Sequence, residues 1–386
     1  MNMNKMIAFA AVAASAAIPM AANADTITTN GVTWTYTVND ATAKTITLGA
    51  AGTTAMPKDA EWNASEIPGK FIIDGETYTV TRIGGSGFYG CSGLRGVLRI
   101  PHSITHIDCN QCFRGCSGLT GVSSWGGLTH FQNNFLTACT ALKGPLPSFS
   151  QFTGLSNGSY NSYAMFNECY SLTGVCIAGN IKLNVGYMFR SARAMKILLA
   201  GPGTSGVVNL TQNSMFNGVS SKCVVIVPRT GWDGLKLGGG GNTVTYYGPA
   251  DEITSLTIDE THRVVSMTPT TKESFTNALE FASLFKEYLD LDTRISVTNT
   301  LDLADVTITE DMVSGVTFDR LMFSAKTQAQ LNAILGAFPA TTPISIDPTG
   351  LTENMTIPND YPNVFVKTVP GVTIRRTAKG FMIIVK

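Results

Sequence analysis

The chain has 386 residues, 27 acidic and 27 basic side chains, only 14% charged residues and 38 glycines. This length predicts about two or three domains with room for a sizeable core. The low charge and the 44% share of hydrophobic residues exclude a disordered chain and a histone-like nucleic-acid binder. The charge is uneven: residues 83–236 contain eleven Lys and Arg against three acids, whereas residues 251–386 contain 17 acids against 11 bases.

Residues 1–24 have the pattern of a secretory signal peptide. Lys5 precedes an apolar run over residues 7–17, and Ala22-Asn23-Ala24 supplies the small residues of a cleavage site. The alternative is an uncleaved membrane anchor, for which the run is short and rich in alanine. No other stretch of the sequence is long and apolar enough to span a bilayer. We therefore expect a secreted or cell-surface protein, with the periplasm as the other compartment, cleaved after Ala24.

Residues 25–69 are predicted to form strands and turns. Val32-Thr-Trp-Thr-Tyr-Thr-Val38 alternates with the period of two that is typical of a half-buried strand. The open end of a repeat stack needs a cover, so we expect this segment to be an N-terminal β cap.

A seven-residue motif recurs through the middle of the chain. Phe88-Tyr-Gly-Cys91-Ser-Gly-Leu94 is followed by similar segments whose aligned Cys, Ala or Val stands at residues 116, 139, 169, 192 and 219. These spacings of 23 to 30 residues are those of leucine-rich repeats. A unit this short cannot bury its apolar face alone, so successive coils are expected to stack with the same residue type at the same level.

Phe-x-x-Cys-x-x-Leu followed by Ile100-Pro101 resembles the BspA-like leucine-rich repeats of secreted and surface bacterial proteins. Val225-Ile-Val-Pro228, with Trp232 after it, resembles the terminal repeat of that family. The resemblance covers roughly residues 70–248, and the period lengthens beyond residue 145. It implies a right-handed leucine-rich repeat solenoid and a role in adhesion to host matrix or cell surfaces.

Residues 251–386 lack the motif and are predicted to form a smaller α/β or α+β domain. Apolar spacing predicts helices over residues 274–289 and 327–338. Strand-like runs cover residues 294–298, 316–323, 344–347, 364–369 and 380–385. We favour a separate domain, and a continuation of the solenoid with longer units is the alternative. The predicted fold class is thus α/β, a solenoid with an N-terminal β cap and a C-terminal α/β domain.

Eight cysteines in an exported chain invite a search for disulfides. The motif position that holds four of them also accepts Ala192 and Val219, which indicates small, buried, reduced side chains at Cys91, Cys116, Cys139 and Cys169. Whether the remaining four form pairs stays open; they are Cys109, Cys112, Cys176 and Cys223.

Cys109-Asn-Gln-Cys112 supplies one close pair of thiols, whereas a structural zinc site usually has two pairs. No thioredoxin-like βαβ pattern surrounds it. We therefore predict no metal site and no cofactor.

The sequence shows no convincing catalytic constellation. The repeats contain only three widely separated acids, and no Gly-x-Ser-x-Gly elbow has plausible partners. We predict a protein that is not an enzyme and has no catalytic residues. Two alternatives stay open: an active site within residues 251–386 with the solenoid as a targeting module, and a structural component of a surface layer.

The basic excess of the repeats is the most informative surface feature. A positive field attracts polyanions, although scattered Lys and Arg can also serve solubility alone. Arg190, Arg193 and Lys196 surround one repeat turn, and Tyr187 beside them could stack on a sugar ring or anchor a protein. We take these four as candidate binding residues for extracellular proteins or anionic glycans. Nucleic acid is not an expected partner.

Overall fold

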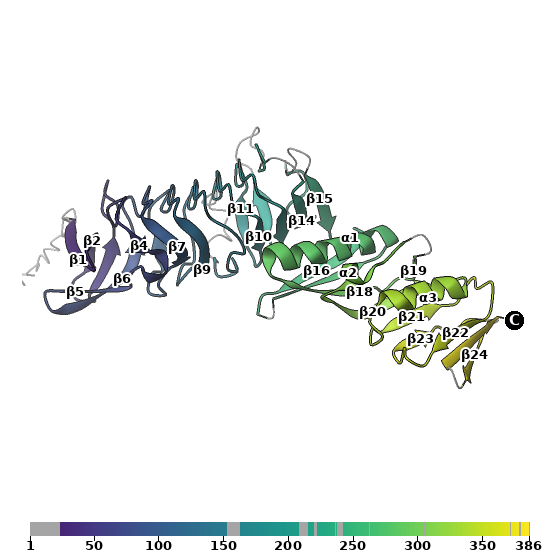
Figure 1. The fold of residues 1–386 in the computed structure, drawn as a ribbon. Helices are drawn as coiled ribbons and strands as arrows, with labels where there is room; N and C mark the ends of the chain where they lie inside the picture. The colour runs from purple at the N-terminus through teal and green to yellow at the C-terminus, as the bar shows by residue number, and fades with distance from the viewer. Residues whose placement is uncertain are drawn as a thin grey trace, which may run out of the picture.

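The computed structural model describes residues 24–152, 163–207, 215–219, 222–235, 237, 242–261, 263–303, 306–370, 372–377 and 380–385. Figure 1 shows an elongated molecule in which stacked coils lead from the N-terminal strands to a region of strands and helices at the C-terminal end. This architecture is α/β and rich in strands, as the sequence predicts. The predicted signal peptide lies outside the described residues, apart from Ala24.

Six strands form a sheet at the N-terminal end: β1 (Asp25–Thr29), β2 (Val32–Asp40), β3 (Thr45–Leu48), β5 (Lys70–Ile73), β6 (Glu76–Ile83) and β8 (His106–Ile107). Strand β2 contains the predicted alternating segment, and its Trp34 is completely buried. The Trp34 ring lies 5.0 Å from the Trp62 ring and 6.3 Å from the Phe88 ring, measured between centroids. The sheet therefore packs directly on the first repeats and shares their core.

The strands of the repeat region are parallel and adjoin one another in chain order. One sheet contains β4 (Trp62–Asn63), β7 (Leu94–Arg99) and β9 (Leu119–Ser124), with the short helix η1 (Ala64–Glu66) after β4. A second contains β10 (Gly174–Ile177), β12 (Ile197–Ala200), β14 (Val224–Pro228) and β15 (Thr243–Tyr247). On another side of the coils β11 (Lys182–Asn184) pairs with β13 (Ser205–Val207). Strand β4 belongs to a coil that precedes the first Phe-x-x-Cys motif, within the segment predicted to be the cap.

The Phe-x-x-Cys turns are also hydrogen-bonded from coil to coil. The amide of Phe113 donates to the carbonyl of Phe135 at 3.0 Å, and that of Phe166 donates to Met188 at 2.9 Å. The same pattern runs from Phe189 to Met215. Each coil thus supplies hydrogen-bond partners for backbone groups of its neighbour, even where no regular strand is formed.

The phenylalanines of successive motifs stack inside the coils. The Phe88 and Phe113 rings lie 5.1 Å apart with an interplanar angle of 5°, and Phe166 and Phe189 lie 5.5 Å apart at the same angle. The third motif has Leu136 in place of phenylalanine, and there the preceding residue, Phe135, contacts Phe113 edge-on. All of these side chains are completely buried.

A left-handed turn follows each motif phenylalanine by two residues. Gly90 and Gly115 hold this position with φ angles of 71° and 74°. The equivalent residues of the next three motifs are Ala138, Glu168 and Ser191, which adopt φ angles of 58°, 61° and 58°. Non-glycine residues rarely adopt this conformation, so the stacked neighbours must enforce it in the later coils.

A second region follows residue 252. Its main sheet contains β16 (Ile253–Asp259), β17 (Val264–Pro269), β18 (Asp292–Ser296), β19 (Leu301–Asp302), β20 (Val316–Ser324), β21 (Ile344–Asp347) and β23 (Val364–Val366). All pairs in it are parallel except β16 with β17. A small antiparallel sheet of β22 (Met355–Pro358), β25 (Gly380–Val385) and β24 (Val372–Thr377) ends the described chain.

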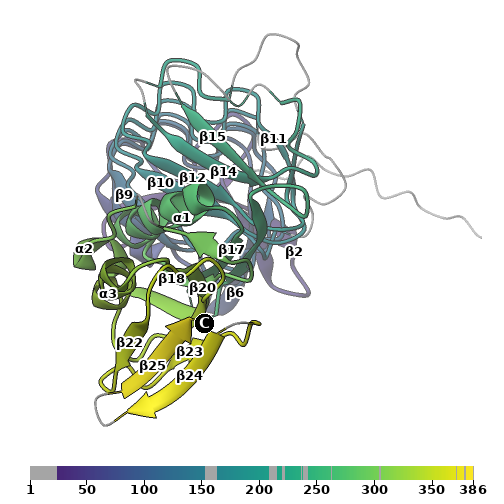
Figure 2. The same cartoon turned by 90° about the vertical axis from the view of Figure 1, so that its right-hand side faces the viewer.

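Both predicted helices are confirmed. The first comprises α1 (Lys272–Leu284) and the π-helical turn η3 (Phe285–Leu289), with Thr271 and Ser274 forming a capping box at its start. The second is α3 (Gln328–Ala337), and a short helix α2 (Glu310–Val313) lies between them. Figure 2 shows the three α-helices on the same side of β17, β18 and β20. The strands of this mostly parallel sheet follow one another in chain order, and a second hydrophobic core lies around them.

The second region docks on the outer face of the β10-β12-β14-β15 sheet. Leu198 points into the coils, whereas Ile197, Leu199 and Ile226 point outward and belong to the core of the second region. This explains the uninterrupted apolar sequence of β12, because a strand covered on both faces has no polar side. A Cβ atom on Gly174 would lie 2.9 Å from the Leu289 side chain, so the contact is close. By contrast, the outer face of the β4-β7-β9 sheet is open, and Val97 on it is 43% exposed.

The aromatic stack generates a first prediction. Phe113→Ala removes a completely buried ring between two others and should lower the free energy of unfolding by about 3–5 kcal/mol in chemical denaturation. The control Ile72→Ala truncates an apolar side chain that is 70% exposed and should stay within about 0.5 kcal/mol of the parent. Equal effects of the two substitutions would contradict the stacked core.

The docked face generates a second prediction. Leu199→Ala should lower the free energy of unfolding by about 2–5 kcal/mol, because the side chain is buried in the second core although it lies on the outside of the coils. Val97→Ala, on the open sheet, should change it by less than about 0.5 kcal/mol. A mild effect of Leu199→Ala in the same denaturation experiment would show that the second region does not cover this face in solution.

Candidate functional site

The Phe-x-x-Cys turns form a ridge along the stack, which we call the turn ridge; it comprises residues 86–93, 111–118, 134–141, 164–171 and 187–194. Backbone hydrogen bonds join these turns in register, so residues at equal offsets in the motif are neighbours in space. Tyr187, Arg190 and Arg193 all lie on the fifth turn. The structure therefore brings together three of the four candidate binding residues.

The arginines of the fifth turn lie over tyrosine rings. The guanidinium carbon of Arg190 is 5.1 Å from the centre of the Tyr187 ring, and that of Arg193 is 5.1 Å from Tyr170 on the preceding turn. Tyr187 also packs against Tyr163, with 6.0 Å between ring centres. Burial, together with the neighbouring Tyr187, raises the pKa of Tyr163, and Arg190 partly offsets the effect. The result is a cluster of three tyrosines and two arginines, in which Tyr170 and both arginines are exposed and the other two tyrosines are half-buried. The sequence analysis did not pair Arg193 with Tyr170.

Lys196 lies apart from this cluster. It is exposed and immediately precedes β12, where its backbone bonds to Thr173 and Val224 of the coils on either side. Its ammonium group is close enough to Cys223 to oppose the rise in the pKa of that thiol, which burial brings to about 12. Lys196 thus faces the next coil, and the structure does not join it to Tyr187 and Arg190.

A second cluster of cations and an aromatic ring lies at the other end of the turn ridge and was missed by sequence analysis. The Lys58 ammonium is 5.2 Å and the Arg114 guanidinium 6.0 Å from the centre of the Tyr89 ring, which is on the first turn. Tyr89 and Arg114 both directly follow the motif phenylalanine, so their equal offsets could have revealed the contact. Lys58 comes from the coil before the first motif, for which the sequence gives no signal.

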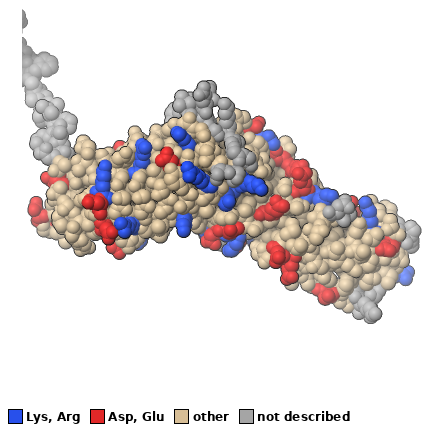
Figure 3. Space-filling model, turned by 45° about the horizontal axis from the view of Figure 1, so that its top comes forward, with Lys and Arg blue, Asp and Glu red and all other residues tan. Residues whose placement is uncertain are grey.

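Two of the three acids in residues 83–236 are paired with arginines outside the turn ridge. Asp108 is bound by Arg82 at 2.7 Å, and Asp233 lies 3.9 Å from Arg229. The third acid, Glu168, is half-buried on the fourth turn. Figure 3 shows Lys and Arg side chains along one face of the coils with fewer Asp and Glu between them. This face therefore carries the excess of Lys and Arg that the composition predicts.

The motif cysteines link successive coils through hydrogen bonds of their thiols. Cys116, Cys139 and Cys169 donate their thiol hydrogens to the motif residue of the preceding coil, at 3.0, 3.1 and 3.2 Å from the carbonyl oxygens of Phe88, Phe113 and Leu136. Burial raises the pKa of each thiol, to about 12 for Cys169. All eight cysteines are free in this structure. Within the described residues no three His, Cys, Asp or Glu side chains are arranged to hold a metal ion.

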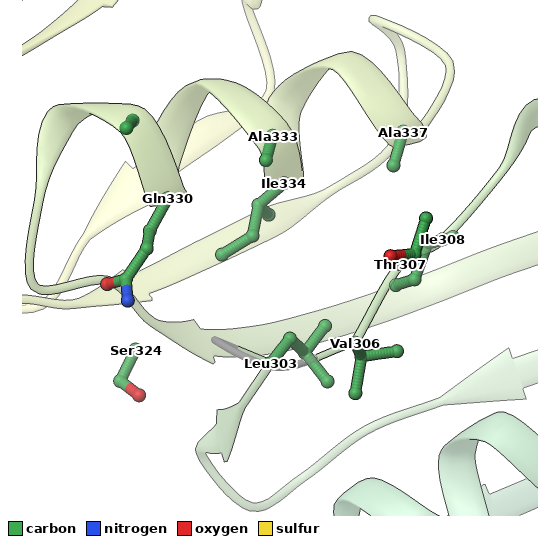
Figure 4. Close-up of a pocket in the computed structure, with 10 residues that line it drawn as sticks. Leu303, Val306, Thr307, Ile308, Ser324, Gln330, Ala333, Ile334 and Ala337 are labelled. Atoms are coloured by element: carbon green, nitrogen blue, oxygen red, sulfur yellow. The ribbon is translucent and has the colours of Figure 1, made fainter.

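A cavity of about 380 Å³ lies in the second region. Figure 4 shows residues of α3 on one side of it, among them Gln330 and Ile334, and the segment with Leu303 and Val306 on the other. Its lining is mainly aliphatic and includes no Asp, Glu, His or Cys among the described residues. The carboxylates nearby are paired with lysines instead, Asp302 with Lys326 at 3.3 Å and Asp347 with Lys367 at 2.9 Å.

No family model matches the chain, and no curated protein matches it. Among solved structures it is similar to a leucine-rich cell surface protein from Faecalibacterium prausnitzii, with 11% identity, a TM-score of 0.38 and coverage of 90% of this chain and 96% of that one. It is also similar to a leucine-rich repeat protein from Bacteroides ovatus, with 13% identity, a TM-score of 0.36 and coverage of 88% and 90%. The pneumococcal vaccine antigen PcpA matches with 11% identity, a TM-score of 0.22 and coverage of 89% and 99%. The structural neighbours are thus leucine-rich repeat and surface proteins, and the likeness describes fold alone.

No helix within the described residues combines the length and apolarity needed to cross a membrane.

The Asp347 pair generates a third prediction. Burial by itself raises the pKa of Asp347, but hydrogen bonds from Thr349 and Lys367 outweigh it and lower the pKa to about 2. An unfolded aspartate has a pKa of about 3.9, so this carboxylate stabilises the fold fully above that pH and loses its effect as the pH falls towards 2. Asp347→Asn should therefore be destabilised at pH 7 and should show a shallower loss of stability between pH 4 and 2, measured by denaturation at each pH.

The exposed Asp360 provides the control. Asp360→Asn should retain the pH dependence of the parent. If Asp347→Asn also retains it, the carboxylate is not held ionised by its neighbours.

Proposed function

We propose that the chain is a non-enzymatic binding protein, secreted or at the cell surface, whose coils are a BspA-like leucine-rich repeat solenoid. Its turn ridge recognises anionic groups on extracellular glycans or proteins. The observation that carries the proposal is the cluster on the fourth and fifth turns, where Arg190 and Arg193 lie over Tyr187 and Tyr170.

The geometry of the cluster suits the recognition of sulfate and carboxylate groups. A guanidinium group stacked on a ring has its N–H groups in its own plane, which is the geometry in which arginine makes bidentate contacts with planar or tetrahedral anions. Stacking also restricts the long arginine side chain before the ligand arrives, which lowers the entropic cost of binding. Tyr170 is 39% exposed and offers an aromatic surface beside the charge.

The position of the second region favours the turn ridge, rather than the outer face of the sheet, as the binding surface of the later coils. The outer face of β12 and β14 is buried under it, so a ligand reaching these coils meets the turns.

The alternative of an active site within residues 251–386 gains nothing from the cavity in that region. An aliphatic lining suits the binding of an apolar group, and the nearby carboxylates of Asp302 and Asp347 are paired with Lys326 and Lys367. No particular observation favours a structural role in a surface layer over binding.

The proposal predicts salt-sensitive binding to a sulfated glycan. The purified full-length mature chain should bind immobilised heparin and not neutral dextran. Its affinity should fall as salt rises from about 0.1 M to about 1 M, because the Debye length shortens from about 10 Å to about 3 Å. Arg190→Ala with Arg193→Ala should weaken binding about tenfold or more, the equivalent of losing about 1.4 kcal/mol.

Arg294→Ala is the matched control, because Arg294 is half-exposed in the second region and paired with Asp319. It should bind heparin like the parent. If the double variant binds as well as the parent, or if binding does not depend on salt, the turn ridge is not the binding site. If the parent binds neither heparin nor any of an array of matrix proteins, the proposed function is wrong.

A further inference from the structure

Cys109 and Cys112 are placed differently from the motif cysteines. Both follow β8 in the turn that leads into the second motif, and both are buried, with exposures of 3% and 0%. Their sulfurs lie on the same side of the turn, and both are close to the Gly87 backbone. Each motif cysteine directs its thiol to a carbonyl of the preceding coil at 3.0 to 3.7 Å.

Gly87 of the preceding coil makes room for the two sulfurs. A Cβ atom built on Gly87 would lie 2.7 Å from the Cys112 sulfur and 2.9 Å from the Cys109 sulfur. Both sulfurs therefore occupy one small hollow above the Gly87 backbone. Any side chain at Gly87, whose φ angle is 52°, would displace them.

The neighbouring thiol does not compete for this pairing. The Cys116 sulfur lies 3.0 Å from the carbonyl oxygen of Phe88 and is satisfied by that bond. Cys109 has only a long contact of 3.9 Å to the carbonyl of Ile83. The pair that shares a turn and a hollow is thus Cys109 with Cys112.

We propose that Cys109 and Cys112 form a disulfide in the exported protein and that the free thiols are its reduced form. One thiolate attacks the disulfide of a thiol–disulfide oxidant, and the second displaces the oxidant's remaining sulfur from the mixed disulfide. The two cysteines lose two protons and two electrons, and the oxidant is reduced to a dithiol. The inference rests on the export that belongs to the proposed function, since the cytosol keeps thiols reduced.

The cross-link has a defined structural role. It closes the turn at the base of the second motif, against the Gly87 backbone of the first. Because both sulfurs are buried, exchange with the oxidant takes place before this part of the stack has closed. Once formed, the disulfide fixes the turn where the N-terminal sheet meets the coils.

The test is the thiol count of the full-length mature chain. Protein from an exported fraction, and reduced protein refolded in a glutathione redox buffer, are denatured in acid and alkylated before any reduction. We expect six alkylated cysteines of the eight, with peptide mapping assigning the link to Cys109 and Cys112. Eight alkylated cysteines in both samples, or a link between other residues, would overturn the proposal.

Variants separate the disulfide from the binding function. Cys109→Ala with Cys112→Ala should show six alkylated cysteines and no protected pair, and its melting temperature should not respond to dithiothreitol. The parent should melt a few degrees lower when reduced. A parent that has been unfolded, reduced and refolded in dithiothreitol, and that then melts no lower than the untreated parent, lacks the disulfide. Heparin binding should be the same in the parent and this variant. If no disulfide is found, the proposed function is therefore unaffected, and if heparin does not bind, the disulfide proposal is unaffected.

Discussion

The whole structure depends on the registered stacking of one turn on the next. Amide-to-carbonyl bonds such as that from Phe113 to Phe135 hold successive turns together, and the motif rings stack in the space inside them. Neither contribution exists within a single coil, so no coil is stable without its neighbours. The same register places Tyr89 next to Arg114 on the surface, and Arg193 next to Tyr170. A pattern that arises for the sake of the core thereby determines which side chains meet on the outside.

The second region changes what the coils present to solvent. In an isolated stack the outer faces of all strands would be exposed to solvent, but here the outer face of β12 is buried in the second hydrophobic core. The outward apolar residues of β12 and β14 would otherwise be an exposed patch prone to association. The exposed surface of the later coils is consequently concentrated on the turn ridge, where the charge is positive and the aromatic rings are held by arginines.

The sequence predicts those features that repeat. The Phe-x-x-Cys spacing predicts the coils, the burial of the motif cysteines and the nearness of Arg190 to Tyr187. It could not predict that the ring of Phe135 replaces the missing ring at Leu136, because this depends on packing between coils. The contact of Lys58 with Tyr89 was also beyond its reach, since Lys58 precedes any recognisable motif. The two later helices followed from apolar spacing, whereas short strands such as β22 carry too few residues for a clear period.

The outer apolar face of β12 and β14, on which the second region packs, also limits how the molecule can change in length. Each coil adds about 5 Å to the stack, the separation of neighbouring strands. A coil inserted between β7 and β9 would extend the turn ridge and leave the docked surface untouched. A coil inserted between β12 and β14 would move Leu199 away from Ile226 and split the apolar face against which the second region packs. Duplication and loss of repeats are therefore compatible with this architecture in the N-terminal half of the stack and incompatible with it in the C-terminal half.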